Sequence, residues 1–218
     1  MSDRLTTTRF LIDTGVVAVV RADDPGLLTE AAAALAEGGV KAIEITMTTP
    51  GALGVIAALA AKPPAGCLIG VGTVLDPETA RAAILAGAGF LVAPGLDLRT
   101  IELAHRYDKA VLPGAFTPTE IIAAWQAGAD LVKVFPADTL GPAYLRAVKA
   151  PLPQVRMCPT GGVTAENAGE WIRAGASCVA AGGSLISKRH LAERDLDGIR
   201  ASAARFAAAV REARAVGG

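Results

Sequence analysis

The chain has 218 residues, of which 52% are hydrophobic, and its 21 basic and 21 acidic side chains cancel to a net charge near zero. This balance offers no basic surface for nucleic acid and no Lys/Arg run for an anionic membrane, so we expect neither as a partner. The length is enough for one large core, and no linker or composition shift divides the chain, so we expect residues 1–218 to form a single domain.

The N-terminal segment, MSDRLTTTRFLIDTG, mixes charges with short apolar stretches, which is typical of neither a signal peptide nor a membrane span. We expect it to form an N-terminal helix. Cys67, Cys158 and Cys178 are scattered without C-x-x-C spacing, which favours reduced, packed thiols over disulfides or zinc ligands. These features predict a soluble protein of the cytoplasm.

Short apolar runs rich in β-branched residues recur along the chain. They are VVAVV from Val16, KAIEIT from Lys41, LIGVGTV from Leu68, FLVAPG from Phe90, AVLPGA from Ala110, LVKVFPA from Leu131, QVRMCPTGG from Gln154 and CVAAGGS from Cys178. Their starts lie 20 to 27 residues apart, which leaves room for one strand and one helix each. The segments between them, such as LLTEAAAALAEGG and PETARAAILAGAG, are alanine-rich and have helical periodicity.

The ends of these helices carry their own signals. Asp76-Pro77 and Thr117-Pro118 each pair an N-cap residue with a first-turn proline. Left-handed C-caps are expected at four glycines: Gly38, Gly87, Gly128 and Gly175.

Eight βα units with continuously apolar strands predict an α/β protein whose parallel sheet is covered on both faces. The closed solution is a (β/α)₈ TIM barrel. A doubly wound open sheet is the alternative, but no G-x-G-x-x-G follows the first strand.

Lys133 stands in the middle of DLVKVFPAD, residues 130–138, an otherwise apolar strand. A charge buried there costs several kcal/mol unless it is paired or neutralised. One interpretation is an edge strand that leaves the ammonium in water, which is difficult for the sixth of eight strands. The other is chemical, because a desolvated amine attacks carbonyl carbons and forms Schiff bases.

Period-two alternation puts Lys133 on one face with Phe135, Glu44 on one face with Thr46, and Arg21 at the inward end of the first strand. Glu44 is the only carboxylate inside a predicted strand, so it is the candidate acid/base. Glu44 could instead be a structural partner of a buried cation, and Thr46 and Thr73 could be simple β-formers.

Two glycine-rich turns, PTGGV (159–163) and AAGGS (180–184), follow the last two strands, where barrels often bind phosphate through backbone N–H groups. His105 falls in a predicted helix and His190 after the last strand, without the spacing of zinc ligands. We therefore expect a phosphate site but no metal and no cofactor.

Between Gly15 and Ser187 the chain carries, in order, the motifs EGGVKAIEIT, GVGTVLDP, VAPG, LPGAFTPTE, LVKVFPA, PTGGV and AAGGS. By these motifs jointly it resembles the 2-keto-3-deoxy-6-phosphogluconate (KDPG) and 4-hydroxy-2-oxoglutarate (KHG) aldolase family. The resemblance implies a homotrimeric class I aldolase that needs no metal and cleaves KDPG into pyruvate and glyceraldehyde 3-phosphate. Lys133 would be its Schiff-base lysine and Glu44 its acid/base.

The resemblance also implies the substrate-binding residues. Thr73 would contact the pyruvate carboxylate. The residues around the anionic groups would be Thr160, Gly161, Gly162, Gly182, Gly183 and Ser184, and those lining the same mouth would be Pro94, Pro113 and Phe135.

One position departs from the pattern, because Thr48 stands where many members have an arginine for the pyruvate carboxylate, while Arg21 ends the first strand. A relative that acts on 2-keto-3-deoxy-6-phosphogalactonate shares the strand-one arginine, whereas PTGG is more typical of the phosphogluconate enzymes. A phosphate-binding epimerase or sensor without Schiff-base chemistry is the alternative from another class.

Overall fold

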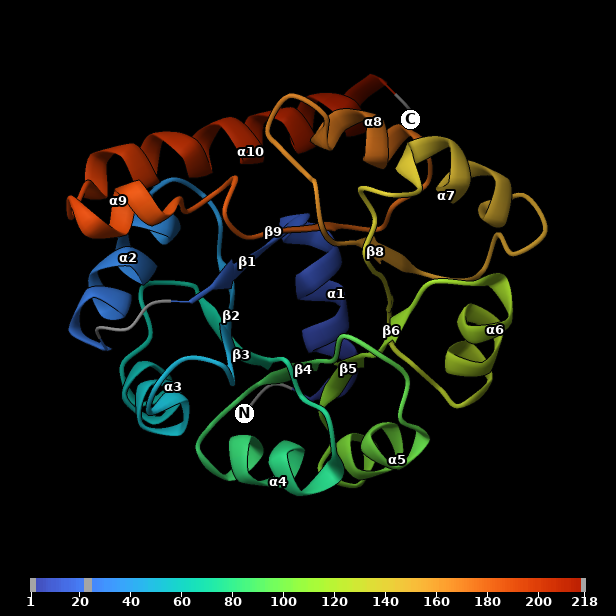
Figure 1. The fold of residues 1–218 in the computed structure, drawn as a ribbon, viewed down its shortest axis with the longest axis horizontal. Coiled ribbons are helices and arrows are strands. Elements are labelled where there is room, and N and C mark those ends of the chain that lie inside the picture. The colour runs from blue at the N-terminus through green and yellow to red at the C-terminus, as the bar shows by residue number, and fades with distance from the viewer. Residues whose placement is uncertain (1–2, 22–24, 217–218) are drawn as a thin grey trace.

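The computed structural model describes residues 3–21 and 25–216, in which strands and helices alternate along most of the chain (Figure 1). The strands are β1 (Val16–Val20), β2 (Ala42–Thr46), β3 (Leu68–Gly72), β4 (Phe90–Val92), β5 (Ala110–Leu112), β6 (Gly114–Ala115), β7 (Val132–Val134), β8 (Met157–Pro159) and β9 (Val179–Ala181). The helices are α1 (Arg4–Thr14), α2 (Pro25–Glu37), α3 (Ala52–Ala61), α4 (Pro77–Leu85), α5 (Leu98–Arg106), α6 (Pro118–Gln126), α7 (Gly141–Lys149), α8 (Ala168–Arg173), α9 (Lys188–Ala192) and α10 (Leu196–Val216).

The strands form two parallel sheets, one of six strands in the order β5-β4-β3-β2-β1-β9 and one of three in the order β6-β7-β8. Only Pro113, which has no N–H for a ladder, separates β5 from β6, so the strand expected from Ala110 is divided between the sheets. On the other side a parallel bridge between Thr160 and Ala180 joins the end of β8 to β9. Figure 1 shows the six-stranded sheet curled, with helices around its outer face.

Alternate strand residues belong to two separate cores. One packs the strands against the surrounding helices and includes Ala18, Ile43, Val132 and Val179. The other fills the inside of the curl and includes Val17, Ala42, Leu131, Cys158 and Cys178. The predicted two-residue alternation is confirmed, and by it Glu44 and Lys133 belong to the inner face.

Helix α1 closes one end of the inner core. Leu11 is fully buried among the inward side chains of the strands, and α1 contacts β1 and β5. In Figure 1 it lies across the ring of strands, while the other helices lie around the ring. The N-terminal helix is thus confirmed, and it leaves the carboxyl ends of the strands as the open side.

The capping predictions hold at most helix ends. Asp76 accepts from the N–H of Thr79, and Thr117 forms a capping box with Glu120. The glycines after α4, α6 and α8 adopt positive φ as predicted, but after α2 the prediction of Gly38 is wrong, because Gly39 has the left-handed φ of 95°. A Cβ at Gly38 would overlap Ala203 of α10, so that glycine permits close helix packing instead.

Among the described helices, none is both long and apolar enough to cross a bilayer.

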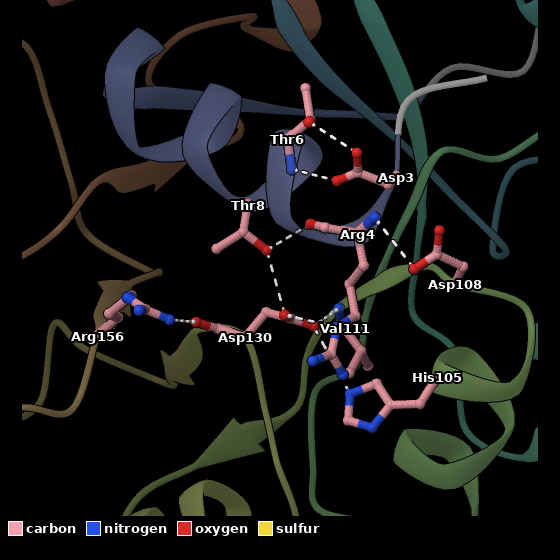
Figure 2. A network of polar contacts seen from close by, with 9 residues as sticks. All are labelled: Asp3, Arg4, Thr6, Thr8, His105, Asp108, Val111, Asp130 and Arg156. Carbon is pink, nitrogen blue, oxygen red and sulfur yellow. Dashed lines mark hydrogen bonds and ion pairs between the residues drawn. The ribbon is translucent and has the colours of Figure 1, made fainter.

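A polar network around Asp130 fastens α1 to the rest of the protein (Figure 2). The Asp130 carboxylate, 4% exposed, accepts from Thr8 Oγ1 at 3.2 Å and from the Val111 N–H at 3.0 Å, and Arg4 Nε lies 3.4 Å from it. His105 Nε2 lies 3.7 Å away, too far for a hydrogen bond. Burial lowers the pKa of His105, so Arg4 and not His105 supplies the positive charge beside the Asp130 carboxylate.

We expect Asp130→Ala to lower the free energy of unfolding by about 3 kcal/mol, because it leaves the Arg4 side chain and the buried Val111 N–H without their acceptor. Urea denaturation followed by circular dichroism measures this change. Asp13→Ala is the matched control, since Asp13 is 69% exposed and pairs with Arg9 on the same helix at 3.8 Å. An exposed pair of this kind contributes at most about 1 kcal/mol. Equal losses in the two variants would contradict the role given to Asp130.

Candidate active site

Lys133 lies in the middle of β7 with 6% of its surface exposed. β7 pairs with β6 on one side and β8 on the other, and Lys133 stands opposite Gly114 and Cys158. The edge-strand interpretation of this lysine is therefore wrong. Its Nζ lies 4.9 Å from the centre of the Phe135 ring, whose face attracts the ammonium without giving it a hydrogen-bond acceptor.

Glu44 lies on β2 with 1% of its surface exposed, and its Oε2 has no hydrogen-bond partner among the described residues. Burial raises the pKa of the Glu44 carboxyl above its ordinary value, while the charges of Lys133 and Arg21 act in the opposite direction. Both cations are therefore close enough to influence the carboxyl electrostatically. A raised pKa and an unpartnered oxygen suit a group that exchanges protons.

Strand β3 has a glycine, Gly72, at the place where the Glu44 carboxyl lies. A Cβ at Gly72 would overlap the Glu44 Oε1 atom, and a Cβ at Gly70 would overlap the ring of Phe90. The two glycines stand opposite Thr46 and Glu44 in the β2–β3 register. The Glu44 carboxyl therefore lies against the bare backbone of β3, and Phe90 fills the neighbouring space with apolar surface.

A cavity of about 340 Å³ opens between the two glycine-rich turns. Its lining residues are Val19, Phe135, Thr160, Gly161, Gly162, Val163, Ala180, Ala181, Gly182, Gly183 and Ser184. The structure thus brings together all six residues predicted to surround anionic groups, with Phe135 beside them.

The two turns hold each other in place. Gly161 and Gly162 have φ values of 99° and 66°, which residues with a side chain rarely adopt. Ser184 Oγ donates to the Val163 carbonyl at 2.5 Å and so ties the turn after β9 to the turn after β8. Among the described residues, no hydrogen bond uses the N–H groups of Gly162, Gly183 or Ser184. They remain available to an anion in the cavity.

Arg21 and Thr48 lie outside this cavity, next to the end of β2. Arg21 follows β1, and its Nε donates to Thr46 Oγ1 at 3.4 Å. Thr48 is exposed, with its Oγ1 3.0 Å from Thr46 Oγ1. Thr46, which the sequence suggests only as a β-former, is therefore the residue that connects these two.

The other predicted residues also lie at the carboxyl ends of strands. Thr73 follows β3 in a left-handed conformation with φ of 58°, which is uncommon for a β-branched residue and marks a strained position. Pro94 is half-buried after β4, and Pro113 is buried after β5. All therefore share one end of the sheets with the glycine-rich turns.

The sequence predictions missed Gly70, Gly72 and Val19. Two glycines inside one strand are a signal of close approach by another group, although they do not reveal which group approaches. Val19 carries no signal, because an apolar strand residue that lines a cavity looks like any other. Within residues 3–21 and 25–216, no three His, Cys, Asp or Glu side chains gather as metal ligands would.

The profile of the family described as KDPG and KHG aldolase matches residues 8–202. The 2-dehydro-3-deoxy-phosphogluconate aldolase of Pseudomonas aeruginosa is 39% identical over 158 residues, which are 72% of this chain and 71% of the relative. The 2-dehydro-3-deoxy-6-phosphogalactonate aldolase of Escherichia coli is 35% identical over 199 residues, which are 91% of this chain and 95% of the relative.

A solved structure of the KDPG aldolase of Legionella pneumophila, with pyruvate captured as a covalent carbinolamine, is similar with a TM-score of 0.85. The two chains are 26% identical, and the likeness covers 91% of this chain and 97% of that one.

Proposed function

Because this chain belongs to the KDPG and KHG aldolase family, a family of carbon–carbon lyases, we propose that it is a class I aldolase that cleaves KDPG into pyruvate and glyceraldehyde 3-phosphate. The observation that supports this best is the pair of buried ionisable groups on the inner face, Lys133 in the middle of β7 and Glu44 in the middle of β2. The covalent carbinolamine in the Legionella relative supports the same chemistry.

Lys133 Nζ would attack the C2 carbonyl of the substrate, and loss of water from the carbinolamine would leave an iminium. Glu44, directly or through a water, would take the proton of the C4 hydroxyl. The C3–C4 bond then breaks, its electron pair reduces the iminium to an enamine, and the aldehyde leaves. Protonation of C3 restores the iminium, and water releases pyruvate and the free Lys133 amine.

The cavity between the glycine-rich turns would take the substrate phosphate through backbone N–H groups, that of Ser184 included. Thr73 and Arg21 would take the pyruvate carboxylate, with Thr48, Pro94 and Pro113 around the mouth. KHG, which lacks a phosphate, would use the carboxylate site and the catalytic pair alone.

A second candidate substrate is 2-keto-3-deoxy-6-phosphogalactonate, which differs from KDPG at C4. It is favoured by the Escherichia coli relative of that name and by Arg21, which stands at the end of β1 while Thr48 occupies the usual arginine position.

The test is release of pyruvate, coupled to lactate dehydrogenase, from KDPG, its galactonate epimer and KHG in parallel. We expect turnover of at least one phosphorylated substrate, unchanged by EDTA. An epimerase or a sensor would release no pyruvate from any of the three substrates.

Arg21→Lys is expected to lower kcat/KM by a factor that corresponds to about 1.5 to 3 kcal/mol of lost transition-state stabilisation. The reason is that an ammonium does not form the two parallel hydrogen bonds that a guanidinium makes to a carboxylate or phosphate. Steady-state kinetics measure kcat/KM, and a thermal melt measures the melting temperature. Arg9→Lys is the control, since Arg9 is 85% exposed on α1. If Arg21 is only structural, the melting temperature falls while kcat/KM stays near the parent value, and the anion role is lost. The sequence also allows Arg21 to be a structural partner of Glu44, Asp23 or Asp24, and the last two lie outside the described residues.

We also propose a closed (β/α)₈ barrel in one domain, with β5 and β6 as a single strand position, in a cytoplasmic homotrimer. Leu75, Leu98 and Phe116 are exposed on successive βα units at the open end and would supply apolar contact between subunits. Light scattering of the purified protein distinguishes a trimer from a monomer.

A further inference from the structure

We propose that Thr46 is a positioning residue that holds Arg21 for the carboxylate of the 2-oxo acid substrate, an inference that rests on the proposed aldolase function. Thr46 is 1% exposed at the carboxyl end of β2, and Arg21 directly follows β1. Val20 stands opposite Ile45 in the register of these strands, so the next pair along them is Arg21 and Thr46. The two side chains are neighbours on the inner face of the sheet.

The hydrogen bond has only one sense. Arg21 Nε is a donor with no acceptor capacity, so Thr46 Oγ1 accepts from it at 3.4 Å. The hydroxyl proton of Thr46 is then free to point to Thr48 Oγ1 at 3.0 Å or to Thr49 Oγ1 at 3.4 Å. Thr49 is 3% exposed, so this hydroxyl cluster is anchored in the core and fixes the direction of the Thr46 lone pairs.

The contact uses only the Nε of Arg21. Its two terminal nitrogens make no hydrogen bond or ion pair with any described residue. These are the atoms that form the parallel pair of bonds to a carboxylate. A free arginine loses rotamer entropy when it is fixed, and a hydrogen bond at Nε removes part of that loss before the ligand binds.

The location suits a carboxylate next to the reacting carbon. Arg21 acts electrostatically on Glu44, and so does Lys133, so the three charged groups share one region of the inner face. The carboxylate of a 2-oxo acid is bonded directly to the carbonyl carbon that Lys133 attacks, and its anchor must therefore lie in this region. The glycine-rich turns, in contrast, line a cavity whose lining does not include these three residues and which suits the other end of a phosphorylated substrate.

Thr46→Val tests the proposal, because valine keeps the shape of threonine and removes the hydroxyl. We expect KM for the cleaved substrate to rise on the order of tenfold, the loss typical of one hydrogen bond to a charged group, with kcat changed less than about threefold. Thr46→Ser, which keeps the hydroxyl, is expected to stay near the parent KM. Thr46→Ala repeats the test if the valine variant does not fold, as judged by its urea denaturation midpoint.

Thr100→Val is the matched control, because Thr100 is a buried threonine of α5, 2% exposed, whose hydroxyl donates to Asp97, the N-cap residue of that helix. A double-mutant cycle with Arg21→Met separates positioning from other effects. In the Arg21→Met background we expect Thr46→Val to change KM less than about twofold, since the residue through which it acts is gone.

A parent-like KM in Thr46→Val, or an equal effect of that change with and without Arg21, would overturn the positioning role while leaving the aldolase function intact. If the parent protein neither releases pyruvate nor forms a borohydride-trapped adduct with it, the proposed function itself fails and the inference falls with it.

Discussion

Replacing Lys133 with methionine is expected to abolish covalent capture of pyruvate and to lower turnover by more than about 10³-fold, because the proposed mechanism takes its attacking amine from Lys133. In the parent protein, pyruvate and borohydride should add one reduced pyruvyl group, found by intact mass and assigned to Lys133 by peptide mapping. Lys41→Met is the matched control, since Lys41 is exposed at the start of β2. Labelling that persists in Lys133→Met, or that maps to Lys41 or Lys149, contradicts the assignment.

The same variant separates chemistry from stability. A buried cation is costly, so methionine at position 133 should leave the free energy of unfolding unchanged or increase it. Removing the ammonium also removes an influence that lowers the pKa of Glu44, so the pKa of this carboxyl is expected to rise further. Loss of activity in a variant at least as stable as the parent would place the effect at the reacting amine.

Glu44→Gln is expected to lower turnover by about 10² to 10⁴-fold while imine formation at Lys133 continues, because an amide keeps the shape of the carboxyl but neither accepts nor gives up a proton as a base or acid near neutral pH. Exchange of deuterium from D₂O into the pyruvate methyl group, followed by NMR, isolates the step at C3 from cleavage. Exchange at the parent rate in Glu44→Gln would assign the proton transfer to another group.

The pH profile gives an independent check on Glu44. Glu44 must be ionised to act as a base, so kcat/KM should fall as the pH falls through its pKa. Because burial raises that pKa, the acidic limb should lie above the pH range of an ordinary glutamate. Glu44→Gln should lack this limb, and a limb that survives the substitution belongs to a different residue.

The features that could be predicted from the sequence are those with a local signal. Lys133 and Glu44 stand out because a charge inside an apolar strand is unusual, and Asp76 and Thr117 because cap residues act within one turn. The missing N–H of Pro113 is a local signal for the division of that strand, but the pairing of β6 with β7 in a second sheet has no such signal. The choice of Gly39 over Gly38 was not predictable, since it depends on Ala203, far along the chain. The contact of Thr46 with Arg21 was not predicted, because threonine is common in strands and its presence there does not indicate any further role.

The contact between Gly72 and Glu44 means that each of these two positions restricts which substitutions the other can accept during evolution. The carboxyl fills the volume where any side chain at position 72 would begin, so a single substitution there displaces the Glu44 carboxyl before it can bring any benefit. A larger residue at 72 can be reached only along a path on which position 44 first becomes smaller, and the intermediates on that path lack the carboxylate. Glycine and glutamate at these two places should therefore be inherited as a pair, although 28 positions separate them in the chain.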